Sequence, residues 1–262
     1  MDMFSLKGKV AVVTGATGLL GREHCTALAM AGAHVVAADI SVDMSSLVGE
    51  HLGLNVDVTS IASLEQARDA ALERFGTIDI LVNNAAINDM FEKPEQAGEQ
   101  SRFELFPLET WKKSLEVNIT GVFLASQVFG TVMARKGSGS IINIASTYGM
   151  VGPDQSIYRD EDGNQKFFKS PSYPTCKGAV LNFTRYLAAY WGKDGVRVNS
   201  LSPGGVENSQ DAFFIKNYSA RTVLGRMARP NDYRGAVVFL ASDASAYMSG
   251  ANLVVDGGWT AI

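Results

Sequence analysis

Short apolar runs alternate with amphipathic segments along the whole chain. Runs rich in Val, Ile and Leu, bounded by Gly, Asn, Asp or Ser, are predicted to be buried strands. These runs span 10–14, 33–39, 53–57, 78–83, 140–145, 196–201 and 253–256. Segments with a helical spacing of apolar residues span 19–31, 60–75, 111–135, 172–193 and 232–240. This alternation predicts an α/β fold, in which a parallel sheet of about seven strands is covered by helices on both faces.

The chain of 262 residues is near the upper limit for one hydrophobic core, and it contains no repeat, low-complexity tract or linker. We therefore predict one domain over residues 1–262. Two polar segments, 88–102 and 152–171, interrupt the alternation. Each follows a predicted strand, at the edge where open α/β sheets bind ligands. The second segment, called the polar insert below, is predicted to be a lid over a polar substrate, and the alternative for both is a tolerated surface loop.

Composition narrows the range of partners. A net charge of −4 without a basic tract argues against a nucleic-acid partner, and no apolar run looks long enough to span a bilayer. Residues 1–9 are too polar for a signal peptide, so a cytoplasmic location is expected. Cys25 and Cys176 are expected to be reduced thiols. The three histidines are scattered, and their spacing predicts no metal site.

Tyr173 and Lys177 lie four residues apart in a segment predicted to be helical, so they share one face of that helix. An ammonium group close to a phenol favours the phenolate. Lowering the pKa of a Tyr from about 10 to near neutrality needs roughly 4 kcal/mol of differential stabilisation. A phenol with such a pKa can act as a general acid or base at neutral pH. The same spacing also occurs on ordinary helix surfaces, so the neighbouring motifs decide between the two interpretations.

Three glycines, Gly15, Gly18 and Gly21, lie between the first predicted strand and the first predicted helix. Glycine at such a junction permits a tight turn and a close approach of the backbone to a pyrophosphate. The pyrophosphate then binds at the positive end of the helix. The position of this turn, at the first strand–helix junction of an alternating chain, is the one that a dinucleotide-binding fingerprint requires.

Two carboxylates follow the next two predicted strands. Asp39 can accept hydrogen bonds from ribose hydroxyls and would repel a 2′-phosphate, and its alternative role is to cap a turn. No Arg or Lys lies between Glu23 and Glu65, which favours NAD over NADP as the cofactor. Asp57 ends the third predicted strand and would reach the adenine edge, or it caps the helix that follows.

The ordered series of motifs resembles the short-chain dehydrogenase/reductase family in its compact, single-domain form. The match covers the whole chain, and no single motif carries it. Its further members are Asn83-Asn-Ala-Ala86, Asn118 in Val-Asn-Ile-Thr-Gly, Ser146 in Ile-Ala-Ser, Ser202-Pro-Gly204 and the terminal Val-Asp-Gly-Gly258. The resemblance implies a Rossmann-type doubly wound sheet with one nicotinamide cofactor.

The resemblance assigns a role to each catalytic candidate. Tyr173 would be the general acid/base that exchanges a proton with the substrate oxygen. Lys177 would bind the nicotinamide ribose and depress the pKa of Tyr173, and Ser146 would hydrogen-bond the substrate oxygen. Asn118 would hold a water that links Lys177 to solvent, and a compatible alternative is a satisfied polar residue in a helix kink.

The remaining matched positions are assigned to the cofactor. Residues after the fourth predicted strand would pass beneath the adenosine, and residues after the sixth would shape the loop at the nicotinamide. The full set of cofactor-binding candidates is Gly15, Thr17, Gly18, Leu20, Gly21, Asp39, Asp57, Val58, Asn84, Ala85, Ala86, Tyr173, Lys177, Pro203, Gly204 and Val206.

Three features depart from the family pattern. Gly18 lies one residue before the usual position of the middle glycine, a spacing typical of longer sugar-nucleotide epimerases and dehydratases of the same superfamily. Ser146 and Tyr173 are 27 residues apart, far more than usual, because the polar insert intervenes. Asn208 replaces the usual Thr, which puts one hydrogen bond to the cofactor carboxamide in question.

The sequence therefore predicts an NAD-dependent oxidoreductase that interconverts a secondary alcohol and a ketone. The charged and amide side chains of the polar insert favour a polar small-molecule substrate, such as a sugar, polyol or sugar acid. The alternatives are a 3-oxoacyl reductase, an epimerase or dehydratase that retains its NAD, and a binding module without activity. Apolar residues on more than one face of 111–135 and 172–193 predict, together with the resemblance, a homotetramer.

Overall fold

The computed structural model describes residues 3–47, 51–89, 98–165 and 167–262. These residues form a seven-stranded sheet with the strand order β3-β2-β1-β4-β5-β6-β7. The strands are β1 (Val10–Thr14), β2 (His34–Asp39), β3 (His51–Asn55), β4 (Ile80–Asn83), β5 (Gly139–Ile144), β6 (Val196–Pro203) and β7 (Asn252–Val255). Every pairing between neighbours is parallel. The strand order reverses between β1 and β4, so the predicted doubly wound fold is confirmed.

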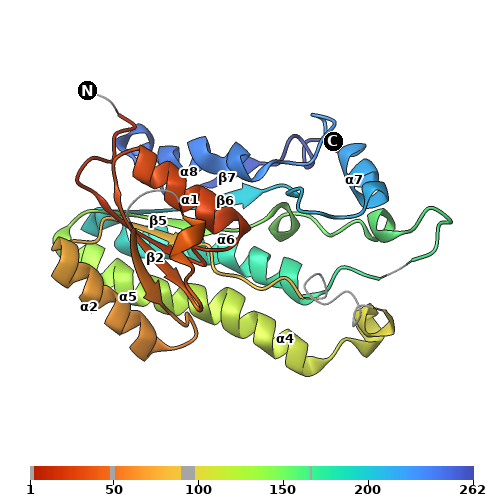
Figure 1. Cartoon of the computed structure of the whole chain (residues 1–262), viewed down its shortest axis with the longest axis horizontal. Coiled ribbons are helices and arrows are strands. Elements are labelled where there is room, and N and C mark those ends of the chain that lie inside the picture. Colours follow the sequence, from red (N-terminus) through yellow and green to blue (C-terminus); the bar gives the residue numbers. More distant parts are fainter. Residues whose placement is uncertain (1–2, 48–50, 90–97, 166) are drawn as a thin grey trace.

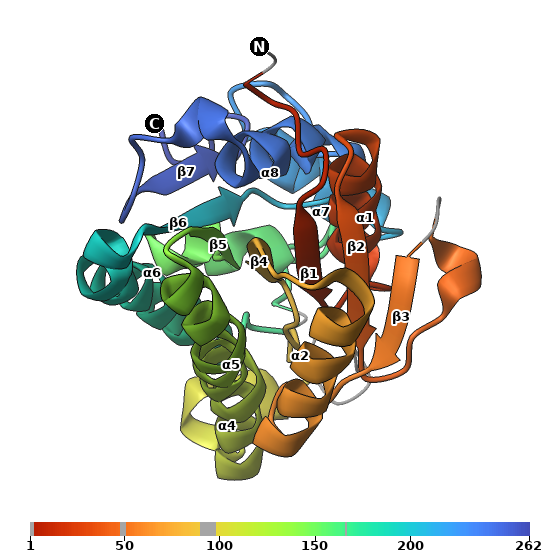
Figure 2. The same cartoon turned by 90° about the vertical axis from the view of Figure 1, so that its left-hand side faces the viewer.

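Helices cover both faces of this sheet (Figure 2). One face carries α1 (Leu19–Met30) and α8 (Arg234–Ala241), which pack against each other. The opposite face carries α2 (Ile61–Phe75), α5 (Gly121–Lys136) and α6 (Ser172–Trp191). Because both faces are covered, successive strand residues enter different cores, which explains why the strands read as continuous apolar runs.

The longest helical stretch combines three elements. It runs from α4 (Leu108–Leu115) through a π-helical turn at Glu116–Thr120 into α5. By length and composition this continuous helix could cross a membrane, which the sequence reading did not anticipate. Half of its apolar window is buried, and α5 packs on the sheet and on α2. This burial accounts for its hydropathy as that of a core helix.

Two details differ from the prediction. The third strand ends at Asn55, so Asp57 lies in the turn beyond it rather than at the strand end. The helix α7 (Ala212–Ser219) was not predicted, because it is short and follows a polar, Gly-rich stretch. A short element that is stabilised by tertiary packing gives only a weak periodic signal.

The polar insert is packed rather than open. Ile157 and Tyr158, in a 3₁₀ turn, are buried in a small core with Phe214 and Tyr218 of α7. Large apolar residues are few in this segment, so its polar composition did not predict this packing. The insert and α7 lie together at one end of the molecule (Figure 1). Residues 90–97 of the first polar segment and Lys166 of the insert lie outside the described residues.

Acid sensitivity of the fold is predicted from His24 in α1. Its ring is fully buried and, within the described ranges, neither ring nitrogen has a hydrogen-bond partner. Burial lowers its pKa from 6.5 to about 4. Below about pH 6.5 the unfolded chain therefore binds a proton at His24, whereas the folded chain does not bind it until about pH 4. The free energy of unfolding consequently falls as the pH drops from 6.5 towards 4. Between pH 7 and pH 5 this linkage should remove about 2 kcal/mol.

Urea unfolding of wild type and His24→Leu at both pH values measures this effect, because the loss caused by other groups is common to both proteins. We expect the wild type to lose about 2 kcal/mol more than the variant. Equal losses in the two proteins would show that His24 is not the sensitive group.

Candidate active site

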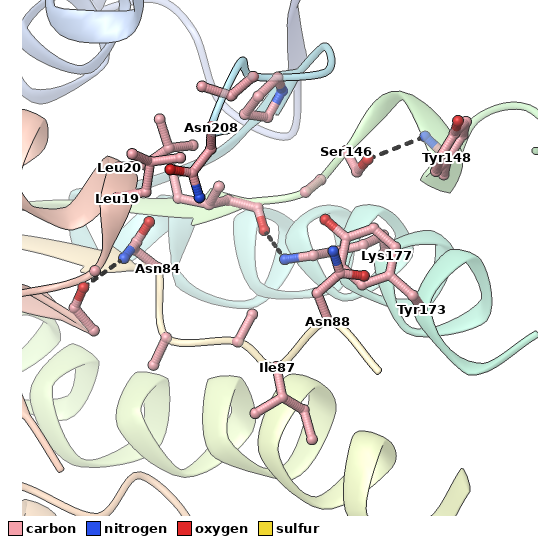
Figure 3. A pocket seen from close by; sticks show the side chains of 18 of the residues that line it. Leu19, Leu20, Asn84, Ile87, Asn88, Ser146, Tyr148, Tyr173, Lys177 and Asn208 are labelled. Atoms are coloured by element: carbon pink, nitrogen blue, oxygen red, sulfur yellow. Dashed lines mark hydrogen bonds between the residues drawn. The ribbon is translucent and has the colours of Figure 1, made fainter. Parts of the chain in front are cut away.

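One cavity of about 750 Å³ opens at the carboxyl ends of the strands, at the point where the strand order reverses. It is lined by the turn between β1 and α1, by residues that follow β2, β4, β5 and β6, and by the first turns of α6. Figure 3 shows side chains from these distant segments converging on it. Parallel α/β sheets bind their ligands at this position.

The Gly-rich turn depends on two of its three glycines. Gly15 has a φ of +62°, and a Cβ there would lie 2.8 Å from the Cα of Ala85. A Cβ on Gly21 would lie 2.0 Å from the carbonyl oxygen of Gly15. Gly18, in contrast, has an ordinary φ of −71°, and a Cβ there would meet only the Gly15 oxygen, at 3.3 Å. The unusual position of Gly18 is therefore accommodated without a special backbone angle.

This turn is joined to the end of β4 by a compact set of hydrogen bonds. Asn84, labelled in Figure 3, donates its side-chain amide to two carbonyl oxygens, that of Thr14 at 3.0 Å and that of Gly15 at 2.9 Å. The Thr14 hydroxyl accepts hydrogen bonds from the backbone N–H groups of Asn84 and Ala85, both at 3.1 Å. Asn84 and Ala85 thus fix the shape of the turn while they line the cavity.

The N-terminus of α1 faces this cavity as an available anion site. Its N-cap residue, Gly18, provides no side chain to cap the first turn. Leu19 and Leu20 of that turn line the cavity. Helix N-termini leave backbone N–H groups unsatisfied and carry a partial positive charge, which suits a pyrophosphate.

The two predicted adenosine-side carboxylates both line the cavity, and both also have local roles. Asp39 accepts a hydrogen bond from the backbone N–H of Thr17 at 2.9 Å, so it ties the Gly-rich turn to β2. Asp57 accepts two from Thr59, from the backbone N–H at 2.9 Å and the hydroxyl at 2.7 Å. The α2 N-cap is Ser60, so Asp57 stabilises the preceding turn rather than the helix itself.

The structure brings Ser146, Tyr173 and Lys177 together on the cavity wall (Figure 3). Ser146 follows β5, and its hydroxyl accepts a hydrogen bond from the backbone N–H of Tyr148 at 3.2 Å. Tyr173 lies in the first turn of α6. Burial raises the pKa of Tyr173, and the nearby Ser146 side chain opposes that rise.

Lys177 lies one helical turn after Tyr173. Its Nζ donates to the carbonyl oxygen of Ile144 at 2.7 Å and lies 5.6 Å from the centre of the Tyr173 ring. Burial lowers the pKa of Lys177 to about 8. A buried lysine in this position can therefore change its charge near neutral pH, and any bound acceptor that favours the ammonium will raise that pKa.

Asn118 does not line the cavity but supports its floor from the π-helical turn. Its side chain accepts from the backbone N–H of Ile87 at 2.8 Å and donates to the Ile87 carbonyl oxygen at 2.9 Å. The amide is thus satisfied by the segment after β4, which corresponds to the structural alternative raised from the sequence. Its relay role through water stays a prediction.

The other cofactor candidates meet in the same cavity, with one exception. Gly21 lies behind the turn and is needed for packing, not for contact. Gly204 is also constrained, since a Cβ there would lie 2.8 Å from the Cα of Asp256 in the terminal motif. The candidates that line the wall beside those already described are Thr17, Val58, Ala86, Pro203, Gly204 and Val206.

Several lining residues were missed from the sequence. Asn88 and Lys169 come from the two polar segments, and Phe214 and Tyr218 come from α7. Lys169 lies four residues before Tyr173 in the sequence, and this short separation was the only indication that it could line the same cavity. No group of His, Cys, Asp or Glu side chains in the described part of the chain could hold a metal ion.

Comparisons with known proteins place this geometry in context. A family model described as Enoyl-(Acyl carrier protein) reductase matches residues 15–260. The chain is 36% identical to D-threitol dehydrogenase of Mycolicibacterium smegmatis, over 98% of this chain and 95% of that protein. It is 34% identical to galactitol 2-dehydrogenase (L-tagatose-forming) of Cereibacter sphaeroides, over 98% and 97% of the two chains.

Solved structures agree with the fold. A gluconate 5-dehydrogenase from Burkholderia cenocepacia, in complex with NADP and tartrate, superposes with a TM-score of 0.83 at 30% identity, covering 100% of this chain and 98% of that one. A short chain dehydrogenase from Leptospira borgpetersenii with bound NAD+ gives a TM-score of 0.85 at 32% identity, covering 98% and 94%.

The close approaches in the Gly-rich turn predict unequal effects of two matched substitutions. Gly21→Ala places a methyl group against the Gly15 carbonyl and should destabilise the protein by roughly 1–3 kcal/mol. Gly18→Ala adds the same methyl group at an ordinary φ and should change stability by less than about 1 kcal/mol. Thermal unfolding without cofactor measures both. A similar loss in the two variants would mean that the turn is not packed as described.

Proposed function

The chain belongs to the short-chain dehydrogenase/reductase family, and we propose that this cavity is where it interconverts a secondary alcohol and a ketone. The protein is an oxidoreductase that acts on CH–OH groups with a nicotinamide cofactor. The observation that carries the proposal is the convergence of Ser146, Tyr173 and Lys177 on a cavity that also contains the Gly-rich turn.

The residues present fit a dinucleotide. The glycine turn leaves space where side chains would otherwise lie, and the uncapped start of α1 suits the pyrophosphate. Asp39 would accept from the adenosine ribose, while Lys177 would bind the nicotinamide ribose. The loop at Pro203 and Gly204 would bound the nicotinamide. When bound, the cofactor supplies or accepts the hydride, and the protein supplies position and electrostatics.

Side chains of the protein would transfer the proton to or from the substrate oxygen. Ser146 would hold the substrate oxygen, and Tyr173 would give a proton to it or take one from it. Because burial raises the pKa of Tyr173, the phenolate needs a nearby positive charge, and Lys177 is placed to supply one. We propose that Asn118, which fixes the floor beneath, also holds a water that links Lys177 to solvent.

The proposed substrate is a polar, hydroxyl-rich small molecule of the sugar, polyol or sugar-acid class. The names of the similar proteins include dehydrogenases of threitol, galactitol and gluconate. The polar insert, together with α7, forms the wall of the substrate end. We propose that this wall covers the bound substrate and excludes water from it. Among the described lining residues, only the position of Gly18 corresponds to the epimerase alternative, and none points to the 3-oxoacyl alternative.

The preferred cofactor is proposed to be NAD, on the strength of the Asp39 carboxylate. One observation favours NADP as the second candidate. Arg22 lies immediately before the region that lacks basic residues, and its Nε donates to the Thr17 carbonyl oxygen at 2.7 Å. Thr17 lines the cavity, so the Arg22 guanidinium lies beside its Gly-rich end.

A homotetramer is the proposed assembly. Phe123 of α5 and Tyr186 and Tyr190 of α6 are exposed, and stacked or tilted ring contacts join them through Phe183. An exposed aromatic surface of this kind is typical of an interface between subunits. A cytoplasmic location is also proposed, since both cysteines are free and buried. Cell fractionation tests the location.

Tyr173→Phe should lower kcat by at least about 100-fold, because only the hydroxyl takes part in chemistry. NADH affinity should stay near that of the wild type, since the ring remains. Lys177→Ala should weaken both kcat and NADH binding. The assay is a panel of sugars, polyols and sugar acids with NAD and NADP. If Tyr173→Phe keeps activity within tenfold of wild type, Tyr148 or Tyr158 becomes the proton donor.

Replacing Asp39 should change cofactor preference. Asp39→Asn keeps an acceptor for the Thr17 N–H but removes the charge, and we expect the NAD/NADP ratio of kcat/KM to fall by about tenfold or more. Asp39→Ala should give a similar ratio with lower stability. Arg22→Gln is the matched test of the opposing residue and should reduce the activity with NADP. A wild type that prefers NADP overturns the proposal.

Light scattering at micromolar concentration should give four times the chain mass of 28.1 kDa. Tyr186→Glu should reduce that mass, because it introduces a charge into the proposed apolar contact. A wild-type mass equal to a single chain would rule out the assembly.

A further inference from the structure

The polar insert places one buried cation at the substrate end of the cavity. Lys169 lines the cavity and is only 7% exposed. Its Nζ lies 4.4 Å from the centre of the Tyr173 ring and donates to the side-chain oxygen of Asn88. The charge therefore lies closer to the ring of the proposed proton donor than the ammonium of Lys177 does.

Contacts on both sides hold Lys169 in this position. Its backbone N–H donates to the Gln155 side chain at 2.8 Å, and Gln155 donates back to the Lys169 carbonyl oxygen at 3.4 Å. The preceding residue, Phe168, donates its N–H to the buried hydroxyl of Ser101 at 2.9 Å. On the other side, the Ser172 hydroxyl donates to the buried carboxylate of Asp89. The two polar segments are thus joined around Lys169, which is preorganised rather than a flexible surface side chain.

Charges are unevenly distributed along the cavity. Among the described residues that line it, the carboxylates are Asp39, the last residue of β2, and Asp57, which follows β3. The cations that line it are Lys113, which is exposed, and Lys169 and Lys177, which are buried and lie next to Tyr173. Lys177 is assigned to the cofactor ribose, and its Nζ lies farther from the Tyr173 ring than that of Lys169 does. Lys169 is therefore the cation best placed to meet the substrate.

We propose that Lys169 determines specificity by binding a carboxylate that the substrate carries close to the carbon being oxidised. This inference rests on the proposed function and narrows its substrate to polyhydroxy acids. An ammonium provides three donors and forms stronger hydrogen bonds with an ionised acceptor than with a neutral hydroxyl. A site that has already desolvated its cation discriminates most strongly in favour of an anionic partner.

Matched pairs of compounds test the proposal. D-gluconate and D-glucitol, and likewise threonate and threitol, differ only in a carboxylate in place of a terminal hydroxymethyl group. The readout is the ratio of kcat/KM for the acid to kcat/KM for the polyol, measured with NAD and NADP. We expect the wild type to favour the acid, and Lys169→Met to lower that ratio by about tenfold or more.

Two further variants separate charge from shape and from location. Lys169→Arg keeps the cation and should retain most of the acid preference. Lys216→Met makes the same exchange at an exposed lysine of α7 that does not line the cavity, and it should leave the ratio unchanged. Thermal stabilisation of the NADH complex by gluconate, compared with glucitol, provides a reading that does not need turnover, and Lys169→Met should remove the difference.

The results separate the role of Lys169 from the proposed dehydrogenase function. An unchanged ratio in Lys169→Met overturns the inference. If the ratio is unchanged but the pH dependence of kcat/KM shifts equally for the acid and the polyol, Lys169 instead affects the ionisation of Tyr173. A wild type that prefers the polyol also overturns it, while leaving the dehydrogenase function intact. Absence of turnover with any alcohol and either nucleotide would refute the proposed function, and the gluconate binding comparison would still decide the role of Lys169.

Discussion

The close approach of Gly15 to Ala85 is the constraint on which the rest of the site depends. β1 and β4 lie side by side where the strand order reverses. The turns that follow these two strands touch at Gly15 and Ala85 and line the cavity. The Gly15 backbone can lie against Ala85 only because it has no side chain, and Thr14 and Asn84 then hold the two turns together. This contact orients the start of α1 towards the cavity. The phosphate end of a cofactor site follows from it.

The end of the cavity near Tyr173 is formed differently, by two long segments that leave the sheet after β4 and after β5 and contact each other. The segment after β4 supplies Asn88 and Asp89, and the polar insert after β5 supplies Lys169. Their mutual hydrogen bonds, and the packing of the insert on α7, bring polar groups to Tyr173 without loosening the strands beneath. Substitutions in these two segments can therefore change substrate specificity, while the sheet continues to position Ser146 and the proposed cofactor site.

The alternation of apolar strands and helices was sufficient to predict the parallel sheet, because burial on both faces leaves a continuous apolar run in each strand. The four-residue spacing located Tyr173 and Lys177, and the family resemblance located Ser146. In the structure Ser146 follows β5, and the pair lies in the first two turns of α6. Periodicity did not show the form of the helix kink suggested at Asn118. The structure has a π-helical turn there, and the Asn118 amide pairs with Ile87, a residue distant in sequence. The packed state of the insert was missed for a similar reason. Ile157 and Tyr158 are apolar residues in a polar segment, and only their contact with α7 buries them.

We propose that hydride passes between the substrate carbon and a nicotinamide that enters and leaves this cavity. The most direct measurement follows deuterium from a secondary alcohol labelled at its carbinol carbon, by mass spectrometry of the nucleotide and the product. We expect the label to appear in NADH released into solution and to be missing from the ketone. A label that returns to the product, with no NADH released, would contradict this claim and would indicate an enzyme that retains its nucleotide, such as an epimerase.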